Sequence, residues 1–280
     1  MTYTTLRVQI QDHVAHITLN RPDKLNAMNQ AFWQEFPNAI RTIDEQSSAR
    51  VIVISGEGKM FSAGMDLNVF MSPSQRLTSG EDGRRSENLR RTVLQLQESF
   101  NVLESARIPV LAAVHNGCIG AGINLVSACD CRYATEDAYF CIKETELGMT
   151  ADVGVLQRLP KIIPEGIVRE MAYTARRLSA PEALNFGLVN AVYPDKESMI
   201  TQVMNIAQQI ARNSPLAVSG SKEMINYTRD HSVADSLKYM ATWQSGMFQP
   251  NEMMKAFQAK AMKETPNYEE LWSIEPAFSD

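Results

Sequence analysis

The sequence lacks the features that would indicate a membrane protein or a nucleic-acid-binding protein. No apolar run is long enough to cross a bilayer. Basic residues are in the minority, because 27 lysines and arginines stand against 32 aspartates and glutamates, which gives a formal net charge of −5. A general basic surface for nucleic acid or for anionic lipid is therefore absent. We expect neither a membrane nor a nucleic acid among the partners.

Cysteine is scarce, and its placement does not indicate a metal site. The four cysteines crowd one stretch, between Cys118 and Cys141, without the Cys-x-x-Cys pairs and histidine partners of zinc sites. We predict reduced thiols and no metal ion. The N-terminus has no apolar signal segment, and the last residues, Phe278–Asp280, are not a peroxisomal address. These observations predict a cytoplasmic protein.

What the sequence does contain, in its first half, is an alternation of short apolar strands and helical segments. Apolar residues recur at helical spacing from about Asn29 to Glu45, where Pro37 is expected to kink or delay the helix. Polar residues 71–88 predict a loop before a helix near Glu87–Ser105. Alternating or continuous apolar runs predict strands, the first two forming a hairpin, at Leu6–Ile10, Val14–Leu19, Val51–Ile54 and Pro109–Val114. This order predicts an α/β core.

After about Thr150 the sequence becomes helical. Serines at 179, 214 and 232 stand where helix N-caps are expected. The predicted helices are Val153–Leu159, Gly166–Thr174, Ala180–Asn185, Lys196–Ala211, Pro215–Thr228, Ser232–Ser245 and Glu252–Glu264. We therefore predict a core of residues 1–200 and a helical region of residues 201–280.

Three segments combine the residue types from which a reaction site could be built. Gly58–Leu67 and His115–Asn124 each follow a predicted strand and contain several glycines, and Lys143–Asp152 sets carboxylates among apolar residues. The glycine spacing after residue 117 is wrong for a dinucleotide fingerprint, and Gly56–Met60 lacks the Ser or Thr of a P-loop. Tight turns alone would also explain the glycines.

These segments resemble the two oxyanion-hole motifs of the crotonase (enoyl-CoA hydratase/isomerase) superfamily. The similarity runs from Asn20-Arg21-Pro22 to the predicted helix Ser232–Ser245. The resemblance implies a crotonase-like spiral of ββα units, followed by a helical C-terminal region that forms a homotrimer or a dimer of trimers. It also implies an acyl-CoA thioester as substrate, with no cofactor other than the CoA that the substrate carries.

The resemblance also implies which residues would bind the thioester. The backbone N–H groups of Met65 and Ala121 would hold its oxygen, as oxyanion-hole donors do. Asp66 would support the first loop rather than transfer protons. The residues expected around the substrate and its CoA are Lys24, Ala27, Ala63, Gly64, Asp66 and Gly120.

Within the superfamily, the chain resembles the Δ3,5-Δ2,4-dienoyl-CoA isomerases more closely than the hydratases. The matching stretches include Gly117–Gly120, Ser127–Tyr133, Ala151–Lys161, Thr174–Arg177, Gly220–Lys222, Arg229–Val233 and Tyr239–Trp243. Those isomerases carry an acidic trio, of which Glu144 and Asp152 match two members. Hydratases carry glutamates at positions 124 and 144, so Asn124 departs from both patterns. Its amide would hydrogen-bond Glu144 or position the substrate without supplying a charge, and we interpret it as a weakening change.

The resemblance predicts that the protein isomerises 3,5-dienoyl-CoA to 2,4-dienoyl-CoA in fatty-acid β-oxidation. Such a reaction removes a proton at C2 and adds one at C6, so it needs a base and an acid. We prefer Asp152 as the base at C2 and Glu144 as the acid at C6, and the reverse assignment stays open. Three alternatives stay open: enoyl-CoA hydration, Δ3-Δ2-enoyl-CoA isomerisation by Glu144, and a CoA-binding homologue weakened at Asn124.

Four polar residues also have structural interpretations. Asp152 fits a helix N-cap, and Asp130 and Arg132 have the arrangement of an ion pair at a strand end. His115 follows a buried strand and is expected to hydrogen-bond the backbone rather than act as a base.

Overall fold

The predicted N-terminal hairpin forms and begins a six-stranded sheet, as the computed structural model shows for residues 3–71, 80–275 and 277, which it describes. The strands lie in the order β1-β2-β3-β4-β6-β9, and all neighbours except β1 and β2 are parallel. Their bounds are β1 (Leu6–Gln11), β2 (Val14–Leu19), β3 (Val51–Gly56), β4 (Val110–Val114), β6 (Cys131–Thr135) and β9 (Ala191–Tyr193). Parallel strands of this kind are covered on both faces.

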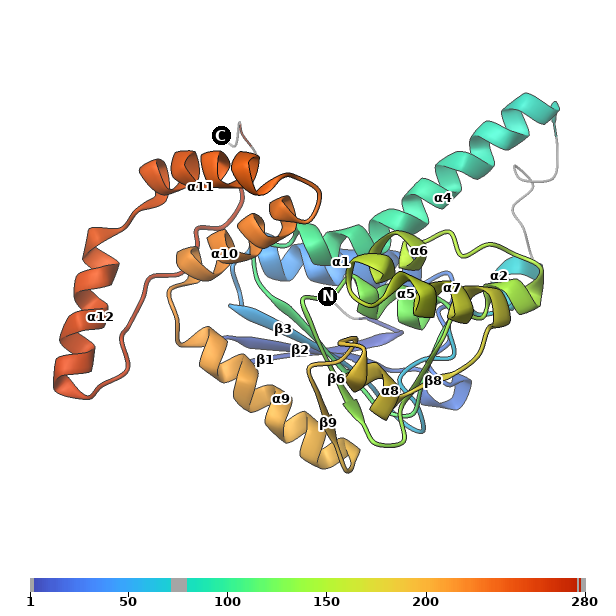
Figure 1. Ribbon diagram of the computed structural model, residues 1–280, viewed down its shortest axis with the longest axis horizontal. Helices are drawn as coiled ribbons and strands as arrows, with labels where there is room; N and C mark the ends of the chain where they lie inside the picture. Colours follow the sequence, from blue (N-terminus) through green and yellow to red (C-terminus); the bar gives the residue numbers. More distant parts are fainter. Residues whose placement is uncertain (1–2, 72–79, 276, 278–280) are drawn as a thin grey trace.

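The alternation of side chains along the strands divides the core into two layers. Val51 and Val53 of β3 pack with α9 (Lys196–Ala211), which lies along one face of the sheet, whereas Ile52 and Ile54 join the larger core on the other face (Figure 1). The helices on that second side are α1 (Phe32–Glu45), α4 (Asp82–Ser105), α5 (Ala121–Ser127), α6 (Val155–Arg158), α7 (Glu165–Thr174) and α8 (Ala180–Asn185).

A second, three-stranded sheet turns the chain into a spiral. Its strands are β5 (Gly117–Ile119), β7 (Tyr139–Cys141) and β8 (Leu178–Ser179), with β7 in the middle. Each turn of the spiral runs from the large sheet to the small one and then to a helix: β4, β5, α5, and next β6, β7 and the 3-10 helix η2 (Glu144–Leu147). This places the starts of α5 and η2 beside each other at one edge of the molecule.

Two local predictions in the first third need correction. Helix α1 begins at Phe32, before Pro37, so the proline does not delay the helix. The segment predicted as a loop is partly helical, because α2 (Asn68–Met71) and the start of α4 at Asp82 lie within or next to it. Residues 72–79 of that prediction lie outside the described part of the chain.

The C-terminal helices form an arm that leaves the sheet. The arm consists of α10 (Pro215–Thr228), α11 (Val233–Met247) and α12 (Pro250–Met262), with α11 and α12 extending away from the body (Figure 1). The predicted caps are confirmed: Ser214 and Ser232 accept hydrogen bonds from the first turns of α10 and α11, and Ser179 forms a capping box at α8. The boundary predicted at residue 200 falls inside α9, whose apolar side packs on the sheet.

Two buried cations fasten the arm at its two ends. Lys222 of α10 donates to the carbonyl oxygens of Leu103 and Ile108 and pairs with Asp130 at 2.9 Å. After α12 the chain returns to the body, where the guanidinium of Arg50 pairs with Glu270 at 2.7 Å. The arm is therefore held where it begins and where it ends.

The predicted ion pair between Asp130 and Arg132 is wrong, because both groups have other partners. The Asp130 carboxylate binds Lys222 and the backbone N–H of Val110. The buried guanidinium of Arg132 donates instead to carbonyl oxygens, including that of Leu188 at 2.7 Å.

Two kinds of feature are absent from the described residues. No helix there combines the length and the apolar character needed to cross a bilayer. In the same residues, no group of three or more His, Cys, Asp or Glu side chains could hold a metal ion.

Candidate active site

The two glycine-containing loops meet at one edge of the sheet. They follow the neighbouring parallel strands β3 and β4, whose C-terminal ends lie at the same edge. The N–H of Ser62 donates to the carbonyl oxygen of Gly117, and the N–H of Ile119 donates back to that of Ser62, each at 3.1 Å. The two loops are therefore hydrogen-bonded to each other.

Gly64 shows how close this approach is. A Cβ at this position would lie 2.6 Å from the carbonyl oxygen of Ile119 and 3.2 Å from the amide nitrogen of Ala121, and the φ of Gly64 is +90°. Both the contact and the dihedral favour glycine. The residue before Met65 thus lies directly against the amide of Ala121.

The amides of Met65 and Ala121 are both available as donors. Ala121 is the first residue of α5, where helix N–H groups have no intrahelical partner. Met28 bonds the residues on either side of Met65, through the carbonyl oxygen of Gly64 and the N–H of Asp66, and so bypasses the Met65 amide. Within the described residues, neither amide donates a hydrogen bond to the protein. The predicted oxyanion donors thus lie on contacting loops.

A turn at residues 20–29 supports the first loop. The side-chain amide of Asn26 donates to the carbonyl oxygens of Glu57 and Met60, and the guanidinium of Arg21 pairs with Asp66 at 3.1 Å. A backbone hydrogen bond from Asn68 holds the pKa of Asp66 below its usual range, with Arg21 adding to the effect. Asp66 is therefore a structural anion of this loop, as predicted.

Apart from Gly120 on the second loop, the residues predicted around the substrate and its CoA lie together on this turn and the first loop. The N–H of Ala63 donates to the carbonyl oxygen of Leu25 at 2.9 Å, which joins the two segments. Lys24 is exposed beside this junction, and Ala27 and Ala63 are half-buried. Arg21 and Asn26 are the side chains that hold the turn in place, and no sequence pattern indicated this role.

Glu144 is a buried carboxyl group with one oxygen left unpaired. It begins η2, is 9% exposed, and accepts a hydrogen bond at Oε1 from the side-chain amide of Asn124 at 3.0 Å. Its Oε2 is buried without a hydrogen-bond partner among the described residues. A Cβ on Gly120 would lie 3.9 Å from Oε1, so this carboxyl group lies beside the residue that precedes the Ala121 amide.

The environment of Glu144 raises the pKa of its carboxyl group above the ordinary glutamate value. Burial raises the pKa of this carboxyl group, and the negative charge of Asp152 raises it further. A buried carboxylate that lacks water and cations holds its proton to higher pH. Such a perturbed acid beside free backbone donors is typical of a reaction site.

Asp152 is the second carboxyl group of the site, and it has a different environment. Its side chain reaches solvent, although protein on the other side partly desolvates it and raises its pKa. The predicted N-cap role is wrong, because α6 begins at Val155 with Gly154 as its cap residue. The backbone carbonyl of Asp152 accepts a 2.7 Å hydrogen bond from Gln97 of α4, a contact that no sequence pattern indicated.

One other polar group, His115, behaves as predicted. His115 is buried, its Nε2 lies 2.9 Å from the carbonyl oxygen of Gly58, and burial lowers its pKa, so it is a neutral structural residue. Glu146 pairs with Lys143 on the surface.

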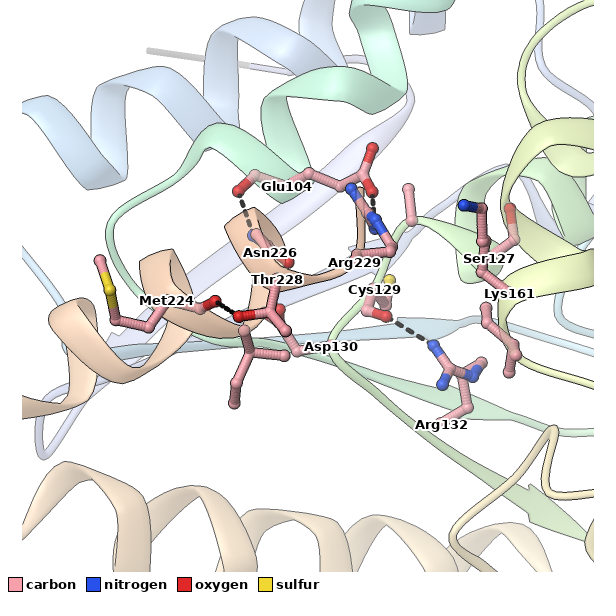
Figure 2. A pocket seen from close by; sticks show the side chains of 13 residues that line it. Glu104, Ser127, Cys129, Asp130, Arg132, Lys161, Met224, Asn226, Thr228 and Arg229 are labelled. Carbon is pink, nitrogen blue, oxygen red and sulfur yellow. Dashed lines mark hydrogen bonds and ion pairs between the residues drawn. The ribbon is translucent and has the colours of Figure 1, made fainter. Parts of the chain in front are cut away.

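A cavity of about 540 Å³ lies elsewhere, between the end of α5, the start of β6 and α10 (Figure 2). Its charged groups are engaged with protein: Arg229 pairs with Glu104 at 2.5 Å, and Arg132 donates to the carbonyl oxygen of Cys129. None of the predicted site residues lines it. We interpret it as the junction between the body and the arm rather than as a reaction site.

Comparison with known proteins agrees with this geometry. The chain matches the enoyl-CoA hydratase/isomerase family over residues 9–271, and it belongs to that family. It is also similar in structure to the enoyl-CoA hydratase of Bacillus anthracis, with a TM-score of 0.83 and 31% identity over 97% of this chain and 100% of that one. The predicted α/β crotonase-like fold with a helical C-terminal region is confirmed.

Within the family, the similarity is high to proteins named Δ3,5-Δ2,4-dienoyl-CoA isomerase. The mitochondrial isomerase of Pongo abelii is 48% identical over 260 residues, which cover 92% of this chain and 79% of that protein. The peroxisomal isomerase of Arabidopsis thaliana is 42% identical over 271 residues, which cover 96% and 98%. Since these names give two different organelles, the cytoplasmic location stays a prediction.

Proposed function

We propose that this protein is a Δ3,5-Δ2,4-dienoyl-CoA isomerase, which converts a 3,5-dienoyl-CoA into the 2,4-dienoyl isomer in fatty-acid β-oxidation. The observation that carries the proposal is the pair of Glu144 and Asp152, whose charges interact, beside two free backbone donors. Substrate and product contain the same atoms, so the protein must only remove one proton and supply another. No cofactor beyond the CoA of the substrate is needed.

The amides of Met65 and Ala121 would stabilise the intermediate. Removal of the C2 proton leaves a dienolate whose negative charge lies largely on the thioester oxygen. Two fixed N–H donors aimed at that oxygen favour the dienolate without reorganisation, and one such donor is worth about 3–4 kcal/mol in comparable sites.

Geometry supports the reverse of the acid–base assignment that we preferred from sequence. Glu144 lies beside Gly120, and therefore close to the amide that would hold C1, so we assign it as the base at C2. In the form of the pair in which Asp152 carries the single proton, the unpaired Oε2 of the Glu144 carboxylate would accept the proton from C2. Asp152 would donate to C6 farther along the chain, and its access to solvent would let the pair restore one shared proton after each turnover.

The isomerase assay tests the function directly. Incubation of the protein with 3,5-dienoyl-CoA should produce the absorbance of a 2,4-dienoyl thioester. A protein that instead hydrates 2-enoyl-CoA, and leaves the 3,5-dienoyl substrate unchanged, would be a hydratase. We expect little hydration, because the amide of Asn124 cannot accept a proton as the second hydratase glutamate does.

Deuterium exchange at C2 tests the assignment of the two acids. Glu144→Gln should lose exchange together with turnover, by about 10²- to 10⁴-fold, which is the usual effect of removing a general base. Asp152→Asn should lose turnover while C2 exchange continues. The opposite pattern would return the assignment to Asp152 at C2.

CoA would lie over the turn that carries Lys24. This turn contacts the first loop through Ala63 and presents the exposed lysine beside it. Lys24→Ala should raise KM for the CoA substrate and leave kcat close to that of the wild type, because an exposed charge on a flexible side chain contributes modestly. A change in kcat alone would contradict this position for CoA.

The arm would form a homotrimer, or a dimer of trimers. In a single chain it exposes large apolar side chains, including Ile225 (71%), Leu237 (64%) and Phe257 (59%). Apolar surface gathered on one region is typical of a subunit interface. Light scattering of Leu237→Asp should show a smaller assembly than the wild type. A control, Leu89→Asp, replaces an exposed leucine of α4 outside the arm and should leave the mass unchanged.

A further inference from the structure

The side chain of Asn124 makes three hydrogen bonds, so it does more than stand in place of a charged residue. It lies in α5, is fully buried, and uses its whole side-chain amide. Its Nδ2 donates to Oε1 of Glu144 and to the carbonyl oxygen of Gly120, each at 3.0 Å, and its Oδ1 accepts from the N–H of Val155 at 2.7 Å. Both donor hydrogens and the acceptor are therefore engaged.

These contacts connect the three segments from which the candidate site is built. Glu144 begins η2, Val155 follows the Asp152 turn, and Gly120 precedes the Ala121 amide. One planar group thus fixes the first acid, the segment of the second acid and the start of the helix that carries an oxyanion donor.

We propose that Asn124 is a positioning residue, which holds Oε1 of Glu144 so that proton transfer occurs at Oε2, and which sets the distance between the Glu144 and Asp152 segments. The part that concerns catalysis rests on the proposed isomerase function. The contacts do not depend on it, so the two can be tested separately.

An aspartate at this position could not make the same contacts without a proton. Its oxygens would face Oε1 of Glu144 and the carbonyl oxygen of Gly120, which are both acceptors. The aspartate would therefore have to share a proton with Glu144, or the two carboxylates would repel each other. Asparagine supplies the same donor permanently, and this argues against our interpretation from sequence that Asn124 weakens the enzyme.

The charged groups around Glu144 decide how an aspartate at position 124 would affect its titration. The ionisable group whose charge acts on it is Asp152. Other charged groups nearby are engaged elsewhere, in the pairs Lys143–Glu146, Arg158–Glu104, Arg169–Glu165 and Arg176–Glu170, or over a ring, as Arg177 is over Tyr139. Burial raises the pKa of the Cys141 thiol, which also interacts with Glu144, and the charge of Glu144 raises it further. A new carboxyl group at position 124 would thus add a third member to a two-acid system.

The test compares Asn124→Asp with wild type and with Ser127→Ala. Ser127 is a matched control, because it is buried in the same helix and donates one hydrogen bond, to the carbonyl oxygen of Asn124. We expect Asn124→Asp to lower kcat about 100-fold at neutral pH, which is the effect of misplacing a reacting group. Its kcat–pH profile should gain an ionisation or move to higher pH. Ser127→Ala should keep the wild-type profile and a kcat within about threefold of wild type.

A second measurement needs no turnover. The carboxyl C=O stretch of Glu144, identified as the infrared band missing in Glu144→Gln, can be titrated in the substrate-free protein. The band should titrate at higher pH in Asn124→Asp than in wild type, and should be unchanged in Ser127→Ala. A wild-type titration and profile in folded Asn124→Asp would overturn the positioning role. Absence of isomerisation in the wild-type protein, with the shifted titration present, would overturn the proposed function alone.

Discussion

The loop edge of the sheet and the base of the arm both bury polar groups, but the groups are fully hydrogen-bonded at the arm and partly unpaired at the loop edge. At the base of the arm, the ammonium of Lys222 has three oxygen partners, and the guanidinium of Arg50 binds Glu270 and two carbonyl oxygens. At the loop edge, Oε2 of Glu144 and the amides of Met65 and Ala121 bind no protein atom among the described residues.

This difference separates stability from chemistry. A buried polar group with all its partners stabilises one arrangement of the chain, whereas one without a partner costs free energy that another molecule can recover. Incomplete hydrogen bonding at Glu144 and the two amides, rather than cavity size, distinguishes the candidate site from the base of the arm. Substitutions in each region test this difference.

The largest effect is expected from Gly64→Ala. The new Cβ would meet the carbonyl oxygen of Ile119 at 2.6 Å, so the two loops would have to separate. We expect kcat/KM to fall by about 10²- to 10³-fold, as when one oxyanion donor is lost. The control is Gly187→Ala, where φ is also positive (+83°) but nothing lies within 4 Å; steady-state kinetics should show near-normal activity there. Equal losses in both variants would mean that backbone strain, not loop contact, matters.

A smaller effect, on folding instead of activity, is expected from Lys222→Met. The change leaves the Asp130 carboxylate and two carbonyl oxygens without their cation, so the free energy of unfolding should fall by about 3 kcal/mol. Lys161→Met removes the exposed pair with Asp230 and should cost less than about 1 kcal/mol. Urea unfolding measures both. If the two variants are equally stable, the buried Lys222 ammonium and its three oxygen partners do not stabilise the fold.

The smallest effect is a gain in stability from Glu144→Gln at neutral pH. Because the folded-state pKa of Glu144 is raised, its contribution to stability is present at acid pH and is lost as the pH rises through that pKa. The glutamine keeps the acceptor for Asn124 and carries no charge. We therefore expect the free energy of unfolding to rise by about 1 kcal/mol at pH 7. The gain should disappear as the pH falls below the ordinary glutamate value of 4.5. Thermal unfolding at several pH values measures this difference. A variant less stable than wild type at pH 7 would contradict the claim that the Glu144 carboxyl group costs stability at neutral pH.

Local patterns predicted most of the helices and the first strands. Alternation predicted the hairpin, and serine caps predicted where α8, α10 and α11 begin, because these signals act over a few residues. The short strands β5, β7, β8 and β9 were missed, since two or three residues carry no periodicity and become strands only through pairing with distant segments; β6, of five residues, was not predicted either. The same reason explains why the partner of Asp130 was wrong: Lys222 comes to it from α10 through the fold.

The candidate site was predicted by residue type but not by contact. The motifs indicated Glu144, Asp152 and the two glycine loops, because glycines and acids after strands are visible in sequence. The hydrogen bond from Asn124 to Glu144 was one of two roles expected for this amide, but its bond to Val155 could not be predicted, since that bond depends on where α6 lies against α5. The N-cap predicted at Asp152 failed for a related reason, because Gly154, with φ +119°, begins the helix instead.

The tie between Arg50 and Glu270 has a consequence for the mobility of the arm. A chain segment tethered at a single point can swing widely, but one fastened at both ends has far fewer conformations. The helices α10 to α12 are therefore restrained at both ends. Loss of the Arg50–Glu270 ion pair would increase their mobility and leave every helical residue in place. Their exposed apolar side chains are thus presented in a fixed orientation, so little entropy remains to be lost when they are covered.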